Sequence, residues 1–184
     1  MTLPVDPIET IAENVVYENR FIQVHDNPVR FPDGSPGTYV RIVESGGRPG
    51  VAALAISDAR IALVHTYRYP TQSWEWGIPR GFANADDPER SVRKELQEEI
   101  GADPTHLEPL VTVHSNSGLL AGQVHIFLAH YAQPATTPLD VREIAAIRWV
   151  TLNELIREIN DGPVCDGFTV AAVGAAYVKG VFPI

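Results

Sequence analysis

The sequence predicts a fold of the α/β (α+β) class, a mixed β-sheet sandwiched between helices, preceded by a strand-rich extension. Short apolar runs separated by turn residues fill the first part of the chain. A strongly amphipathic pattern follows over residues 88–100, and two further helical patterns come after the last strand-like runs. The 184 residues, 45% of them apolar, are enough for one domain with a core and a small appendage.

We expect residues 1–48 to form the strand-rich extension and residues 49–184 to form the main domain. The extension contains three strand-like runs, at residues 15–17, 21–24 and 39–43. The glycine-rich stretch at residues 46–50 breaks the pattern and separates the two parts.

The main domain begins with two apolar runs, residues 51–56 and 60–66, which we interpret as a hairpin around Ser57-Asp58-Ala59. Residues 74–79 are expected to extend this sheet. Three later runs complete the predicted strands, at residues 110–113, 124–131 and 146–150.

The predicted helix over residues 88–100 has a start signal and a stop signal. Asp87 is a good N-cap, Pro88 suits the first helical position, and Gly101 can end the helix in a left-handed conformation. An apolar stripe repeats every four residues, at Val92, Leu96 and Ile100. Further along, Thr151 is a plausible N-cap of a helix that Gly162 ends, and residues 169–179 form a final helix.

Three glutamates, Glu95, Glu98 and Glu99, stand at positions i, i+3 and i+4 of this helix and share one face. Like charges at this spacing repel by about 0.2–0.5 kcal/mol per pair. A hard divalent cation, which prefers oxygen ligands, would offset this repulsion.

Composition excludes some functions and partners. The net charge of −9, with no basic stripe, disfavours binding to nucleic acid or to an anionic membrane. No apolar run approaches the about 20 residues of a membrane-spanning helix, and the start of the chain does not resemble a signal peptide. Cys165 is the single cysteine, which leaves no intrachain disulfide and suits a reducing compartment, so we expect a cytoplasmic protein.

Residues 81–101 resemble the Nudix box: a glycine, a spaced acidic residue, then Arg-Glu-apolar-x-Glu-Glu-x-Gly. Gly81 and Gly101 match its two glycines. Asp86 takes the place of the first glutamate, one residue early, and Lys94 takes the place of the arginine. Further segments resemble the ADP-ribose pyrophosphatase branch of the family, namely residues 31–34, 67–69, 78–81 and 149–169.

The resemblance implies a Nudix fold and a pyrophosphohydrolase that uses Mg²⁺, with Mn²⁺ as a possible substitute. The implied substrate is a nucleoside diphosphate linked to another moiety, either ADP-ribose, cleaved to AMP and ribose 5-phosphate, or an NDP-sugar. It also implies a homodimer built partly from the N-terminal strands.

By the family's pattern, Glu95 and Glu99 would be the main metal ligands, and the backbone carbonyl of Arg80 a further one. Glu98 would be another ligand or would orient its neighbours, so Glu98 and Glu99 both belong to the expected catalytic set. Lys94 would hold these carboxylates in place.

The general base is expected among the acidic residues before the last strand, Asp140 or Glu143, and we favour Glu143. Arg68 and Arg80 are the expected contacts to substrate phosphates, and Trp74 or Trp76 could stack on the base. Two alternatives stay open: an inactive Nudix fold that binds or senses a nucleotide, and an enzyme that cleaves nucleoside triphosphates.

Overall fold

The computed structural model describes residues 6–83, 87–134 and 142–182. The chain divides into two compact units. One holds the residues up to Arg48 together with the segment Asn116–Gly122, and the other holds Pro49–Ser115 and the residues from Gln123 onward.

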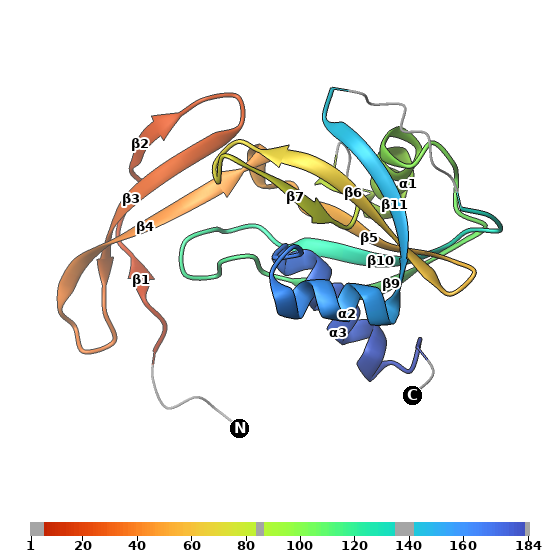
Figure 1. The fold of residues 1–184 in the computed structure, drawn as a ribbon. Helices are drawn as coiled ribbons and strands as arrows, with labels where there is room; N and C mark the ends of the chain where they lie inside the picture. Colours follow the sequence, from red (N-terminus) through yellow and green to blue (C-terminus); the bar gives the residue numbers. More distant parts are fainter. Residues whose placement is uncertain (1–5, 84–86, 135–141, 183–184) are drawn as a thin grey trace. The chain divides into compact units, whose positions relative to one another are not determined.

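The first unit is an antiparallel sheet with β3 at its centre (Figure 1). Its elements are β1 (Glu9–Thr10), β2 (Val15–Glu18), β3 (Ile22–Arg30), β4 (Pro36–Glu44) and the short helix η1 (Ser45–Gly47). β4 pairs with the whole of β3, and β1 and β2 pair with shorter stretches of it. The segment 116–122 joins this unit because Ile42 of β4 exchanges backbone hydrogen bonds with Leu119 and Ala121.

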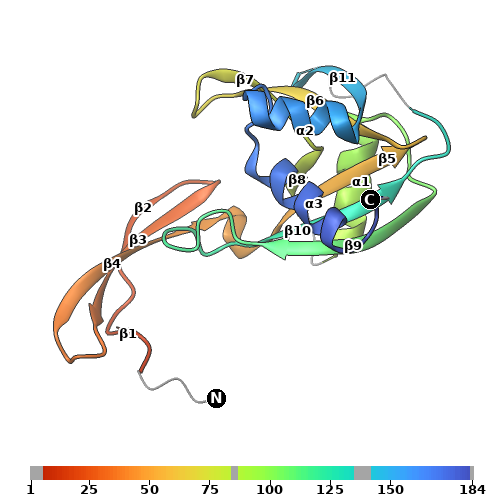
Figure 2. The ribbon, with the colours of Figure 1, turned by 60° about the horizontal axis from the view of Figure 1, so that its bottom comes forward.

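The second unit contains a seven-stranded mixed sheet. Its strands are β5 (Gly50–Ser57), β6 (Arg60–Arg68), β7 (Ser73–Gly77), β8 (Arg80–Phe82), β9 (His106–Val113), β10 (Val124–His130) and β11 (Ile144–Thr151). The order β11-β6-β5-β10-β9 is mixed because β5 and β10 run parallel, while β7 pairs with β6 and β8 with β5. Figure 2 shows β9 and β10 side by side at one edge of this sheet.

The predicted hairpin of β5 and β6 is confirmed, and its paired part is short. The turn residues Asp58 and Ala59 both have positive φ, as tight hairpin turns require. Only Ile56↔Ile61 and Ser57↔Arg60 pair across the hairpin, after which the strands diverge. Beyond these pairs, β8 pairs with the outer part of β5 and β7 with that of β6. Because β5 and β6 diverge, β8 can pair with β5. In the sequence, β8 comes just before the helix that carries the three glutamates.

Helices cover both faces of this sheet (Figure 1). α1 (Pro88–Glu99) packs on one face through Val92, Leu96 and Ile100, and α2 (Leu152–Asp161) and α3 (Gly167–Val178) cover the other. The predicted fold class is therefore confirmed. Within the described residues, no helix is both long enough and apolar enough to cross a membrane.

The helix ends confirm the predicted caps. Asp87 accepts a hydrogen bond from the Arg90 backbone N–H at 3.0 Å, and Gly101 has a φ of 84°. Thr151 forms a capping box with Glu154 at the start of α2. These caps satisfy backbone groups that a helix end leaves without partners.

Candidate active site

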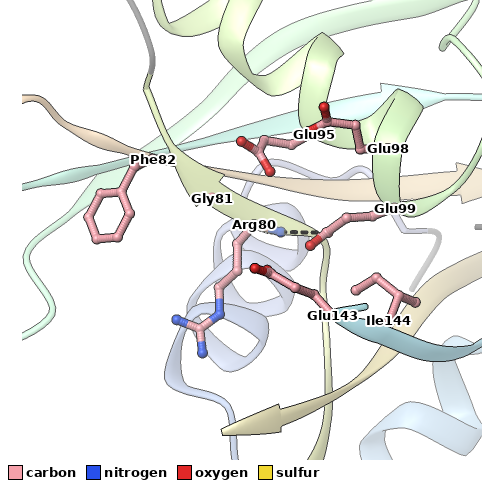
Figure 3. A pocket seen from close by; sticks show the side chains of 8 residues that line it. All are labelled: Arg80, Gly81, Phe82, Glu95, Glu98, Glu99, Glu143 and Ile144. Atoms are coloured by element: carbon pink, nitrogen blue, oxygen red, sulfur yellow. Dashed lines mark hydrogen bonds between the residues drawn. The ribbon is translucent and has the colours of Figure 1, made fainter. Parts of the chain in front are cut away.

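A cavity of about 260 Å³ lies where β8, α1 and the start of β11 meet (Figure 3). Four of its lining residues carry carboxylates and one carries a guanidinium group. The lining residues are Arg80, Gly81, Phe82, Glu95, Glu98, Glu99, Glu143 and Ile144. The sequence-predicted glutamates of α1 and the favoured base, Glu143, therefore line one cavity.

Glu99 is the most buried acid of this cavity, with 8% of its surface exposed. Its Oε2 accepts a hydrogen bond from the backbone N–H of Arg80 at 3.0 Å, which ties the end of α1 to β8. Burial, followed by the nearby charge of Glu95, raises the pKa of Glu99 to about 8. The charged form of this carboxylate needs a nearby positive charge to be stable.

Glu95 lies directly against the backbone of β8. A Cβ placed at Gly81 would overlap the Glu95 carboxylate, with Oε1 only 2.5 Å away. Figure 3 shows this carboxylate beside Gly81. The first glycine of the box is needed here because it lets the carboxylate approach the strand.

Glu98 and Lys94 form an ion pair one helical turn apart. Lys94 Nζ lies 3.0 Å from Glu98 Oε1, and about half of each side chain is exposed, 55% and 42%. In Figure 3 the Glu98 carboxylate points away from Glu143. The structure thus places Lys94 against one of the three glutamates.

The two arginines predicted to contact substrate lie near the acids. Arg80 Nη2 is 3.1 Å from Asp166 Oδ1. Burial, and then repulsion by Arg80, lowers the pKa of Arg68, while Asp166 and Glu99 counteract this shift. Arg68 Nε is buried without a hydrogen-bond partner. Two neighbouring guanidinium groups of this kind favour the binding of an anion.

Glu143 is the candidate base that the structure describes. It lines the cavity, and its charge contributes to the raised pKa of Glu99. Figure 3 shows its carboxylate turned toward Glu99 and Arg80. The other candidate base, Asp140, and the acidic box residue Asp86 lie outside the described residues.

The expected stacking residues, Trp74 and Trp76, do not line the cavity. Side chains alternate along β7, so both tryptophans face away from the side on which Glu75 approaches Arg68. Trp76 stacks on His65 with centroids 4.5 Å apart, and the Arg148 guanidinium lies 4.1 Å from its centroid. These contacts make Trp76 a packing residue.

Phe82 is the aromatic residue that lines the cavity, with 49% of its surface exposed. The sequence interpretation did not select it. The sequence contains one signal that points to Phe82. This residue follows Gly81, the first glycine of the box, and the residues on both sides of that glycine lie at the site.

The donor chemistry of the cavity suits a hard divalent cation. As placed, no three His, Cys, Asp or Glu side chains among the described residues gather closely enough to hold a metal ion. However, a buried Glu99 beside Glu95 is a set of oxygen donors whose mutual repulsion a cation would relieve. Carboxylate oxygens are the donors that such an ion prefers, so the residues fit it by their chemistry.

Comparison with known proteins identifies the family. The NUDIX domain matches residues 46–166 of the chain. A CMP-5'-(N-acetyl-N-hydroxy-3-aminopropyl)phosphonate hydrolase of Streptomyces rubellomurinus is 28% identical over 92% of this chain and 81% of its own length. An ADP-ribose pyrophosphatase of Bacillus subtilis is 26% identical over 93% of both chains.

A solved structure supports the fold. The crystal structure of an ADP compounds hydrolase covers 100% of both chains with a TM-score of 0.81 at 20% sequence identity. The matched domain spans more than half of the chain and contains every box residue from Gly81 to Gly101. The chain therefore belongs to the NUDIX domain family, as the sequence pattern predicts.

Proposed function

We propose that this Nudix enzyme hydrolyses the pyrophosphate bond of a nucleoside diphosphate linked to another moiety. ADP-ribose, cleaved to AMP and ribose 5-phosphate, is the first candidate, and NDP-sugars are the next. The observation that carries the proposal is a cavity in which buried Glu99 and adjacent Glu95 lie near two arginines, Arg80 in its lining and Arg68 close enough for its charge to act on Glu99. The name of the Bacillus subtilis relative, which aligns over 93% of this chain, supports ADP-ribose.

In this proposal the carboxylates of Glu95 and Glu99 hold Mg²⁺, or Mn²⁺ in its place. The Arg80 carbonyl and Glu98 are further candidate ligands, and Lys94 orients Glu98 through their ion pair. When bound, the ion supplies charge neutralisation for the diphosphate and activation of a water molecule. Glu99 keeps its position because the Arg80 N–H holds its other oxygen.

The arginines bind the diphosphate of the substrate. Arg68 has an Nε donor without a protein partner, and Arg80 has 26% of its side chain exposed at the cavity. Guanidinium groups match phosphate oxygens in pairs of hydrogen bonds. They would fix the diphosphate beside the acids of α1 and withdraw charge from the leaving phosphate.

Glu143 is the proposed general base. It takes a proton from the water that attacks one phosphorus, and the bond from that phosphorus to the bridging oxygen breaks. The electron pair of that bond leaves with the bridging oxygen on the second phosphate. Two monophosphates result, and the proton on Glu143 returns to solvent or to the leaving group.

A homodimer through the first unit is part of the proposal. Its strands and loops expose large apolar side chains at 43–59% of their surface: Val15, Val16, Tyr17, Phe21, Tyr39 and Val40. Burial of such side chains between two copies would remove apolar surface from water, which supports the dimer. Light scattering should give twice the 20.1 kDa chain mass, and a monomeric mass would contradict the dimer.

A substrate panel in H₂¹⁸O with Mg²⁺ tests the proposed activity. ADP-ribose, GDP-mannose, UDP-glucose and ATP are incubated with the enzyme, and products are resolved by ³¹P NMR. We expect two monophosphates from ADP-ribose or an NDP-sugar, with ¹⁸O in one of them. Faster cleavage of ATP would contradict the substrate class, and tight binding without turnover would indicate an inactive, nucleotide-sensing fold.

A further inference from the structure

Asp166 is a buried acid that the proposed chemistry does not use. Its side chain is 5% exposed, and both of its oxygens have partners. Oδ2 accepts hydrogen bonds from the backbone N–H of Thr169 at 2.9 Å and from its hydroxyl at 2.7 Å. Oδ1 lies 3.1 Å from Arg80 Nη2. The residue therefore joins the start of α3 to an arginine of the cavity.

Thr169, which donates to Asp166, also holds the turn between β7 and β8. Thr169 Oγ1 also accepts a hydrogen bond from the Ile78 backbone N–H at 2.9 Å. A Cβ at Gly77 would lie 3.1 Å from Asp166, which is tighter than most real contacts, so glycine permits this approach. The backbone that leads into Arg80 is thus fixed to the first turn of α3.

Helix capping alone does not explain a charged residue at this position. An N-cap requires one side-chain oxygen, and Asn or Ser supplies it about as well as Asp. A buried carboxylate is unfavourable unless a cation pairs with it. Arg80 forms the ion pair with Asp166 and Arg68 lies within range of its charge, so the charge of Asp166 serves the arginines of the site, Arg80 by direct contact.

Without Asp166, the Arg80 guanidinium would have other acids within reach. Glu99 and Glu143 line the same cavity, and Glu99 already contacts the Arg80 backbone. An arginine paired with Glu99 would occupy oxygens that the cation needs. Asp166 and the Phe168 ring, 5.0 Å from the Arg80 guanidinium, hold that group on the α3 side instead.

We propose that Asp166 is a positioning residue that holds the Arg80 guanidinium on the α3 side of the cavity, ready for a substrate phosphate and away from Glu99. The inference rests on the proposed function, in which Arg80 contacts substrate. It assigns a role in the site to the C-terminal segment Asp166-Gly167-Phe168-Thr169.

The test is a double-mutant cycle between Asp166→Asn and Arg80→Gln. Asparagine keeps the acceptor oxygen for Thr169 and removes the charge. We expect Asp166→Asn to raise KM for ADP-ribose about tenfold with kcat changed less than about threefold, because ground-state and transition-state binding are lost together. In the Arg80→Gln background, Asp166→Asn should raise KM no further. Asp161→Asn, an exposed acid at the end of α2, is the matched control.

A second readout does not depend on turnover. The Mg²⁺ concentration that gives half of the metal-induced rise in melting temperature, measured without substrate, should increase in Asp166→Asn and return toward the wild-type value in the double variant. A merely structural role predicts additive effects and no recovery in the double variant.

The outcomes separate the two proposals. An active wild type with unchanged KM and Mg²⁺ midpoint in Asp166→Asn overturns this inference alone, as do additive effects in the cycle. A wild type that neither binds nor cleaves any compound of the panel overturns the proposed function and this inference with it. If Asp166→Asn does not fold, Arg80→Lys replaces it. Lysine keeps the charge without the guanidinium fork, and an unchanged KM would then overturn the inference.

Discussion

Replacing Gly81 by alanine tests the close approach between β8 and the Glu95 carboxylate. The added Cβ would lie 2.5 Å from Glu95 Oε1 and closer still to Glu95 Cδ and Oε2, and ordinary contact begins at 3.4 Å, so the carboxylate has to move by about 1 Å or more. The backbone of Gly81 does not have positive φ, so alanine causes no backbone strain there. The flexible end of Glu95 will therefore move, and β8 will stay in place.

A displacement of about 1 Å in a catalytic group costs about 10²-fold in rate. We expect kcat/KM for ADP-ribose to fall about 10²-fold in Gly81→Ala. The melting temperature should stay within about 3 °C of wild type, because alanine in a strand offsets part of the contact penalty. Steady-state kinetics and thermal unfolding followed by circular dichroism measure the two quantities.

The control and the background variant make the test specific. Gly174→Ala in α3 adds a Cβ that meets nothing within 4 Å, so it should leave activity unchanged and raise stability by up to about 1 kcal/mol. In a Glu95→Gln background, Gly81→Ala should cost little further activity. Wild-type turnover in Gly81→Ala, or an equal further loss in that background, would refute the reasoning.

Three further predictions concern stability and metal. Glu158→Gln should destabilise the fold by about 1–2 kcal/mol in urea, because it leaves the Arg148 guanidinium without its bidentate partner; unchanged stability would contradict the pairing. Thr151→Ala removes the capping box of α2 and should cost about 1 kcal/mol with wild-type kinetics, and a loss of activity would mean that α2 supports the site. Mg²⁺ added to EDTA-treated protein at about 100 times its Kd should stabilise wild type by about 2.7 kcal/mol, and Glu99→Gln much less; equal stabilisation would place the ion elsewhere.

Local sequence signals were sufficient for α1 and α2, whereas α3 begins at Gly167, two residues before its predicted start, with Asp166 as an N-cap that was not predicted. Asp87, Pro88 and Gly101 bound α1 as predicted, and its apolar stripe is buried as expected. Capping and periodicity depend on neighbouring residues, so a single sequence contains them. The resemblance to the ADP-ribose pyrophosphatase branch added the grouping of Glu143 with the glutamates, which helical periodicity alone does not give.

The long-range pairing of strands and side chains could not be predicted from local sequence patterns. The divergence of β5 and β6 depends on β7 and β8 pairing into the sheet, and no local pattern signals this. The contact between Arg80 and Asp166 joins residues far apart in the chain, and Trp74 and Trp76 lie on the other face because of strand register. These features depend on tertiary pairing, which composition and spacing do not specify.

The central claim is that the glutamate cluster of α1 serves a metal-dependent pyrophosphohydrolase. The most direct measurement is the initial rate of AMP release from ADP-ribose with Mg²⁺ for wild type, Glu99→Gln and Glu89→Gln. Glu89 lies on the same helix, 4 residues before Arg93, with which it forms an exposed ion pair, so its variant controls for helix charge. We predict wild-type rates for Glu89→Gln and a loss of at least about 10²-fold for Glu99→Gln. Equal AMP release by wild type and Glu99→Gln would contradict the account.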